Sequence, residues 1–179
     1  MVHTAVLVID VQQVLCSGPD AAHDCDGAID RINAVTRNAR LAGAPVILVQ
    51  HESGAGYLEY GSPDWELAQG LHVEPSDVRV RKRTPDAFLQ TDLQSVLEKR
   101  RIRELVVCGM HTEFCIDTTT RRALALGYQV ILVADGHTSA GNAVLSAPQI
   151  IAHHNATLTN ISSFGPRARA VSSSEVQFA

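Results

Sequence analysis

A continuous run of apolar, mostly β-branched residues near the N-terminus constrains the fold more than any other feature. Residues 4–9 read TAVLVI, and the run stops at Asp10. A short apolar run without polar alternation is typical of a strand that is buried on both faces, as in a parallel sheet. Comparable runs indicate further strands at residues 45–49, 78–80, 104–108 and 128–133.

Helical segments are expected between these strands. Apolar residues follow a helical period over residues 28–41, and Gly43 and Pro45 end that segment. The same reasoning predicts helices at residues 91–100, 113–126 and 145–154, with Gly109 breaking the fourth strand and a weak last strand at residues 157–161. Alternating strands and helices predict a doubly wound α/β fold: a mainly parallel, Rossmann-like sheet of six strands with helices on both faces. We expect one domain over residues 1–179.

Composition limits the partners. The formal net charge is −4, so the chain has no overall basic field for nucleic acid or anionic lipid, and no apolar run approaches membrane-spanning length. We therefore expect no nucleic-acid or membrane partner and a cytoplasmic location without a signal segment. The irregularly spaced cysteines, Cys16, Cys25, Cys108 and Cys115, are expected to be thiols there.

The ends of the predicted strands carry the residues that are suited to chemistry, because ligands bind beyond the carboxyl ends of such strands. Asp10 follows the first strand, Lys82 the third, and the loop that leads to Cys115 the fourth. Cys115 falls in the predicted first turn of a helix, where free N–H groups lower the pKa of a thiol. Asp10 could then act as its base, with Lys82 as the compensating charge.

Three segments occur in a distinctive order along the chain: Leu7–Gln12, Arg81–Phe88 with Thr91–Leu93, and Val107–Cys115. Together they resemble the isochorismatase-like cysteine hydrolases, and the resemblance runs from about Thr4 to Thr138. The resemblance implies a catalytic triad of Asp10, Lys82 and Cys115 that hydrolyses carbon–nitrogen bonds in small amides and ureides. It also implies a cis peptide at Met110–His111 and an oxyanion hole formed by the N–H groups of His111 and Cys115.

The resemblance also separates branches of the family. Members that cleave a vinyl ether have glycine in place of the cysteine, so Cys115 argues against that reaction. The nicotinamidase branch binds a metal through an Asp-x-His pair after the second strand, whereas this chain reads Gln50-His51-Glu52 there. We therefore expect no metal and no cofactor. The loop after the second strand resembles that of the metal-free, streptothricin-hydrolase-like branch, which leaves the particular substrate unassigned, and the resemblance implies a homo-oligomer such as a dimer or tetramer.

Several further residues have both a substrate-binding and an ordinary structural interpretation. The candidates for binding substrate are Gln12, His51, Trp65, Phe88 and Phe114, of which the aromatic residues could equally pack the core. Cys108 is expected to be a buried filler, and Asp135 is expected to order its own turn. Cys16, His23 and Cys25 lack the spacing of metal ligands and are expected to be ordinary loop residues.

Two other functions remain open on the same fold. Cys115 could serve in thiol redox chemistry, although no Cys-x-x-Cys pair accompanies it. The chain could also be a binding module that has kept the pocket without catalysis. A dinucleotide site is disfavoured, because no Gly-x-Gly-x-x-Gly sequence follows the first strand.

Overall fold

Six parallel strands form one sheet in the computed structural model, which describes residues 2–178. Their order is β3-β2-β1-β4-β5-β6. Strands β2 and β3 are added on one side of β1 and strands β4 to β6 on the other, so the switch point of the sheet lies between β1 and β4. The strands are β1 (Thr4–Ile9), β2 (Val46–His51), β3 (Val78–Lys82), β4 (Glu104–Met110), β5 (Gln129–Thr138) and β6 (Ala168–Val171). The predicted doubly wound sheet is therefore confirmed.

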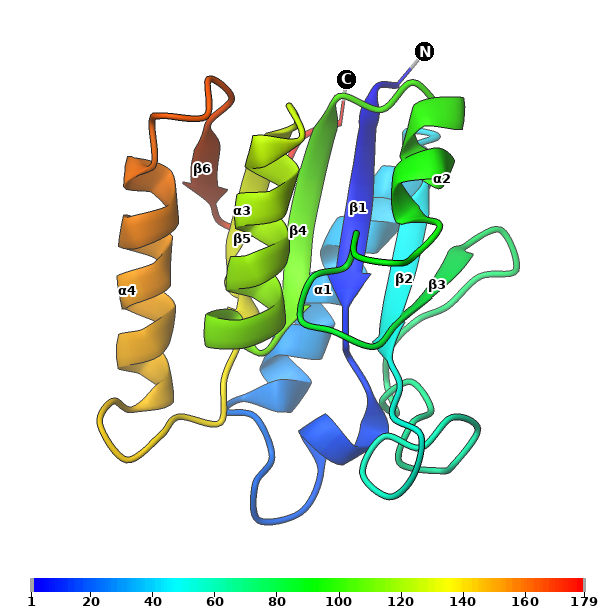
Figure 1. Ribbon diagram of the computed structural model, residues 1–179, viewed down its shortest axis with the longest axis vertical. Helices are drawn as coiled ribbons and strands as arrows, with labels where there is room; N and C mark the ends of the chain where they lie inside the picture. The colour runs from blue at the N-terminus through cyan, green and yellow to red at the C-terminus, as the bar shows by residue number, and fades with distance from the viewer. Residues whose placement is uncertain (1, 179) are drawn as a thin grey trace.

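Helices cover both faces of the sheet (Figure 1). The helical elements are η1 (Gln13–Cys16), α1 (Cys25–Leu41), α2 (Leu93–Lys99), η2 (Thr112–Ile116), α3 (Asp117–Ala125) and α4 (Ala147–Asn160). Helix α1 packs on one face, and α2, α3 and α4 pack on the other. Each face has its own apolar core, and Cys115 belongs to the core under α2, α3 and α4.

Gly109 does not end the fourth strand as the sequence predicted. It lies inside β4 with φ of 120° and pairs with Ile9 of β1. A Cβ atom at this position would lie 2.0 Å from the carbonyl oxygen of Ile9. The glycine therefore permits the close approach of β4 to the end of β1, where Asp10 follows.

The predicted last strand at residues 157–161 is wrong, because α4 continues through Asn160 and β6 comes later. The β-branched Thr157, Thr159 and Ile161 suggested a strand. In the structure Leu158 is fully buried in the core, and the Thr159 hydroxyl donates to the Asn155 carbonyl one turn earlier. Tertiary packing thus outweighs the local strand preference.

The predicted helix at residues 113–126 begins with a different turn. Residues 112–116 form the π-helical turn η2, in which the Ile116 N–H donates to the His111 carbonyl, and α3 follows directly. Cys115 lies in this turn, directly after the Met110–His111 peptide bond, which is cis.

The expectation of four thiols is also wrong. The chain folds back after η1, so that the Cα atoms of Cys16 and Cys25 lie 5.6 Å apart and the two residues form a disulfide. Cys108 and Cys115 are free and buried. Cys108 lies in the core under α1, in agreement with its expected role as a filler.

A long segment joins β2 to β3 and returns to the end of β1. Within it the Ala68 N–H donates to the Val11 carbonyl, and Leu67 forms an antiparallel bridge with Gln12. The segment therefore lies against the same sheet edge as Asp10. Among the described residues, no helix has the length and apolarity needed to cross a membrane.

Candidate active site

The Lys82 ammonium group is the centre of the site. Lys82 ends β3, and its side chain has no exposed surface. Its Nζ lies 2.7 Å from Asp10 Oδ2, 3.1 Å from Cys115 Sγ and 3.0 Å from His51 Nδ1. It also donates to the Thr84 carbonyl at 3.1 Å. The structure thus brings together Asp10, His51, Lys82 and Cys115 from the carboxyl ends of four neighbouring strands.

Asp10 is held by the backbone on both sides. Its N–H donates to the Val49 carbonyl at 2.8 Å, and its own carbonyl accepts the Gln12 N–H. Its φ of 53° is unusual for a residue other than glycine, and such strain concentrates at functional sites. Its Oδ1 atom is buried and has no hydrogen-bond partner among the described residues. One carboxylate oxygen therefore binds Lys82 while the other is available to a neighbouring proton.

The pKa of the Cys115 thiol is raised, contrary to the low pKa that the sequence suggested. Burial raises its pKa to about 12, and the negative charge of Asp10 adds to this rise. The charge of Lys82 opposes the rise but does not outweigh it. We expected the N-terminal turn of a helix to dominate, whereas desolvation of the buried sulfur is the larger effect.

His51 is neutral and accepts a hydrogen bond from Lys82. Partial burial lowers the pKa of His51, and the adjacent positive charge of Lys82 lowers it further. Because Nδ1 faces the ammonium group, the imidazole proton is on Nε2. His51 therefore keeps an N–H donor on Nε2, the nitrogen that does not face Lys82.

Asp10, His51 and Cys115 also have the chemistry of metal ligands. Their ligand atoms all lie within 4.8 Å of one another. Lys82 Nζ, however, lies within 3.1 Å of all three groups. The lysine thus supplies the positive charge at the place where a metal ion would have to bind these residues.

Gln12 and Trp65 shape the site through the backbone. The Gln12 side chain is fully buried, donates to the carbonyls of His51 and Trp65 and accepts the His51 N–H at 2.8 Å. It therefore joins the end of β2 to the long segment after it. The Trp65 ring is half-buried and packs edge-on against Tyr60 at 4.9 Å.

The remaining predicted residues differ in exposure. Phe88 is buried in the core and stacks on Tyr128 at 5.9 Å, so it does not line the pocket described below. Phe114, directly before Cys115, is 56% exposed. The His111 imidazole is neutral, because burial lowers its pKa, and its Nε2 has no hydrogen-bond partner among the described residues.

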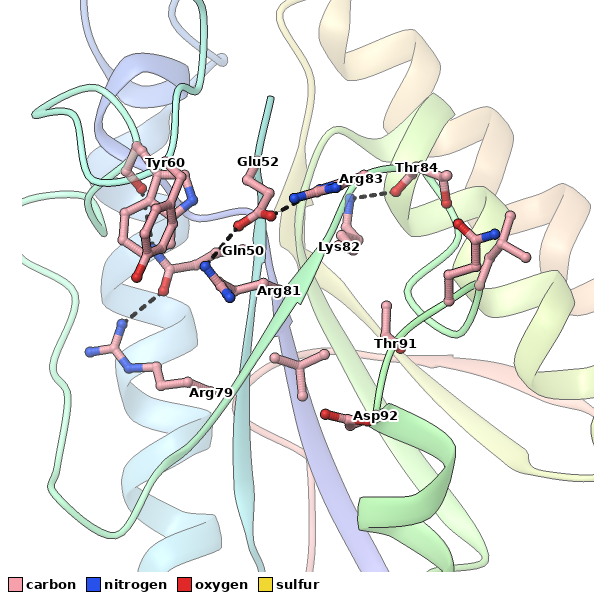
Figure 2. A pocket seen from close by; sticks show the side chains of 14 residues that line it. Gln50, Glu52, Tyr60, Arg79, Arg81, Lys82, Arg83, Thr84, Thr91 and Asp92 are labelled. Carbon is pink, nitrogen blue, oxygen red and sulfur yellow. Dashed lines mark hydrogen bonds and ion pairs between the residues drawn. The ribbon is translucent and has the colours of Figure 1, made fainter. Parts of the chain in front are cut away.

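A pocket of about 760 Å³ lies along β3, the edge strand, and Lys82 forms part of its wall (Figure 2). Trp65 and Tyr60 line it together with three arginines, Arg79, Arg81 and Arg83. Asp10, His51 and Cys115 are not among its lining residues, so Lys82 is the member of the buried cluster that this pocket touches.

Glu52, for which no sequence pattern predicted a role, joins two of the arginines that line this pocket. It is 7% exposed and pairs with Arg83 at 3.0 Å and with Arg81 at 3.3 Å, as Figure 2 shows. Arg81 also lies over the Tyr60 ring, 4.3 Å from its centre. On the side of the arginines, the sequence did contain one sign of these ion pairs. Arg81 and Arg83 alternate with Lys82 along the chain, so their side chains point away from the core that buries Lys82 and can pair with an acidic partner on the other face.

The prediction for Asp135 was wrong, and His137 received no prediction. Asp135 lies within β5, and its carboxylate accepts the N–H and hydroxyl of Ser173 instead of ordering its own turn. His137 is 2% exposed and bonds to Thr112, the first residue of η2. A histidine that follows Asp-Gly in a strand gives little sign of such a partner.

The fold and site together define a doubly wound α/β protein with a buried Asp–Lys–Cys cluster at the switch point of its sheet. The model of the isochorismatase domain matches residues 4–166, and the chain belongs to the isochorismatase family.

Known relatives and structures agree with this membership. The chain is 36% identical over 136 residues to a streptothricin hydrolase of Streptomyces noursei, an alignment that covers 75% of this chain and 49% of that protein. It is 31% identical over 175 residues to a ureidoacrylate amidohydrolase of Caulobacter vibrioides, covering 77% and 78%. This chain spans about half the length of the streptothricin hydrolases that it matches.

Solved structures show the same fold. A crystal structure described as an isochorismatase family protein superposes with a TM-score of 0.87 at 34% identity, covering 95% of this chain and 98% of that one. A cysteine hydrolase from Pseudomonas syringae superposes with a TM-score of 0.86 at 26% identity, covering 97% and 90%.

Proposed function

We propose that this chain hydrolyses a carbon–nitrogen bond, other than a peptide bond, in a small amide or ureide through an acyl intermediate on Cys115. The observation that carries the proposal is the Lys82 ammonium group, which contacts both Asp10 and Cys115 inside a buried cluster. The named activities of the streptothricin hydrolase and ureidoacrylate amidohydrolase relatives support the reaction class.

The first half-reaction uses Asp10 as the base. Asp10 removes the thiol proton as Cys115 Sγ attacks the carbonyl carbon, and Lys82 stabilises the sulfur while its charge is negative. This coupling is needed because a thiol with a pKa of about 12 contains little thiolate near neutral pH. The tetrahedral intermediate then expels ammonia or an amine, which takes the proton from Asp10 and leaves a thioester.

The second half-reaction restores the enzyme. Asp10 removes a proton from water, the resulting hydroxide attacks the thioester carbonyl, and the acid leaves as the sulfur regains a proton.

In both steps the N–H groups of His111 and Cys115 would bind the oxyanion. The N–H groups on either side of Cys115, those of Phe114 and Ile116, already donate to the His111 carbonyl, which supports Cys115 as the donor of this turn.

The pocket suggests which substrates to test first. Arg79, Arg81 and Arg83 line it beside Lys82, and guanidinium groups bind carboxylates in a two-pronged geometry. The panel should therefore pair each neutral amide or ureide with an analogue of similar size that carries a carboxylate.

The decisive experiment measures ammonia or amine release across this panel for the wild type, Cys115→Ala and Cys108→Ala. Cys108 is the matched control, because it is the other free, buried cysteine. We expect turnover to disappear in Cys115→Ala and to persist in Cys108→Ala, and mass spectrometry of quenched wild type to find an acyl group on Cys115. Hydrolysis that survives in Cys115→Ala would rule out the nucleophile.

A further inference from the structure

An irregularity in β5 places His137 next to the turn that carries Cys115. The pairing of β4 with β5 shifts from Val107↔Leu132 to Gly109↔His137, so β5 contains extra residues over this span. Gly136 is required there, because a Cβ atom at this position would lie 2.6 Å from Val133 Cγ1. Such bulges occur beside active sites, where they redirect a side chain.

The redirected imidazole joins three elements. His137 Nδ1 lies 2.8 Å from the Thr112 hydroxyl of η2, and Nε2 lies 3.0 Å from Asn155 Oδ1 of α4. Asn155 in turn donates from Nδ2 to the Ala134 carbonyl at 3.0 Å. Figure 1 shows α4 beside α3, the helix that directly follows η2 in the chain, and the imidazole joins β5 to both η2 and α4.

These contacts fix the direction of every hydrogen bond. Because the Asn155 amide group donates to Ala134, its oxygen faces His137 and accepts the Nε2 proton. Nδ1 is then a bare acceptor, and the Thr112 hydroxyl donates to it. Burial lowers the pKa of His137 to about 4, so this neutral arrangement persists through the neutral pH range.

Asp135, within the irregular part of β5 between Leu132 and His137, is also held in place. The Asp135 carboxylate accepts the Ser173 N–H at 2.7 Å and the Ser173 hydroxyl at 2.9 Å. A second tie, from the Ser139 hydroxyl to Glu113 Oε1 at 2.8 Å, holds the next residue of η2. The turn is therefore clamped to the end of β5 at both Thr112 and Glu113.

We propose that His137 is a positioning residue that holds η2 through Thr112, and so keeps the Cys115 sulfur in line with Asp10 and Lys82. It does not touch the reacting atoms. Its effect on turnover rests on the proposed function, whereas its effect on the order of the turn does not. A displacement of the sulfur by about 1 Å can cost up to about a hundredfold in rate.

The test compares Thr112→Val, His137→Leu and the double variant. Thr112→Val keeps the volume and removes only the hydroxyl donor. Thr36→Val is the matched control, because Thr36 is equally buried but lies on α1. His137→Asn is the conservative rescue, since the asparagine oxygen can occupy the place of Nδ1.

Two readouts are measured: kcat and KM on the best substrate of the panel, and hydrogen exchange of the amides of residues 112–116. We expect Thr112→Val and His137→Leu each to lower kcat at least tenfold with little change in KM and to accelerate exchange in η2. The double variant should be no worse than the more affected single variant, because both remove the same contact. His137→Asn should regain most of kcat.

Wild-type kcat and wild-type exchange in folded Thr112→Val would overturn the proposal, as would additive losses in the double variant. If His137→Leu does not fold, Thr112→Val decides the question alone. If the wild type shows no turnover that depends on Cys115, the proposed function fails, while the exchange data still decide whether His137 orders the turn.

Discussion

At the scale of single residues, Lys82 combines a fully buried side chain with four polar contacts. Its ammonium group is enclosed by Asp10, His51, Cys115 and the Thr84 carbonyl, and its side chain has no exposed surface. Removing one partner of a buried ion pair leaves an uncompensated charge, whereas removing both partners often costs little. The Asp10–Lys82 pair therefore allows stability and catalysis to be separated.

Lys82→Met is expected to destabilise the protein by about 3–5 kcal/mol and to abolish hydrolysis, because the buried Asp10 carboxylate loses its ion-pair partner. Adding Asp10→Asn should restore much of the free energy of unfolding but none of the activity. Urea unfolding and ammonia release measure the two quantities. A double variant as unstable as Lys82→Met would contradict the assignment of the loss to the unpaired charge.

The ionisation of Cys115 gives a second prediction at this scale. The charge of Asp10 raises the thiol pKa and that of Lys82 lowers it. Asp10→Asn should therefore bring the pKa below about 12, although it removes the base and the activity, and thiolate formation should begin at lower pH. Ultraviolet absorbance of the thiolate, with Cys115→Ala subtracted, follows this change. An unshifted or raised titration in Asp10→Asn would show that Asp10 does not act on the sulfur.

At the scale of elements, the parallel pairing of β1 with β4 fixes the distance between base and nucleophile. Asp10 follows Ile9 at the end of β1, and the turn of Cys115 follows β4. The close approach of Gly109 to Ile9 therefore sets the positions of both Asp10 and Cys115. Gly109→Ala should force β1 and β4 apart and cost several kcal/mol, through both clash and positive φ. Urea unfolding and ammonia release should both show the loss.

Gly127→Ala separates these two causes. Gly127 also has a positive φ, of 97°, but a Cβ atom there would have no neighbour within 4 Å. It should cost only the backbone strain, on the order of 1 kcal/mol, and leave turnover unchanged. If the two alanine variants are equally stable and active, the close approach at Gly109 has no functional importance.

The elements also show how far the sequence could be interpreted. The buried runs predicted the five strands from β1 to β5, because such runs have few alternatives in a chain of this length. They failed at residues 157–161, of which residues 157–160 belong to α4. Leu158 packs into the core under this helix, and its partners there are distant in the chain, so no local pattern predicts the contact. The same holds for the site: strand ends indicated Asp10, Lys82 and Cys115, whereas Glu52 and His137 owe their roles to partners distant in the chain.

At the scale of the whole molecule, neutral buried imidazoles couple folding to pH. Burial lowers the pKa of His51, His111 and His137, and that of His137 reaches about 4. An unfolded histidine has a pKa of about 6.5, so the unfolded state binds these protons first on acidification. The contribution of these imidazoles to stability should therefore be constant above about pH 7 and fall as the pH drops from about 6.5 towards 4.

His137 alone should account for about 2 kcal/mol of this loss at pH 5, since the proton binds the unfolded state about 2.5 pH units earlier. Urea unfolding at pH 7.5 and pH 5 compares the wild type with His137→Asn and with His153→Asn, an exposed control on α4. His137→Asn should lose less stability between the two pH values than the wild type, and His153→Asn should lose as much. Equal losses in all three proteins would mean that His137 binds its proton as readily in the folded state as in the unfolded state. A protonated Nδ1 cannot accept the Thr112 hydrogen bond, so this contact could not then hold the turn of Cys115 at acidic pH.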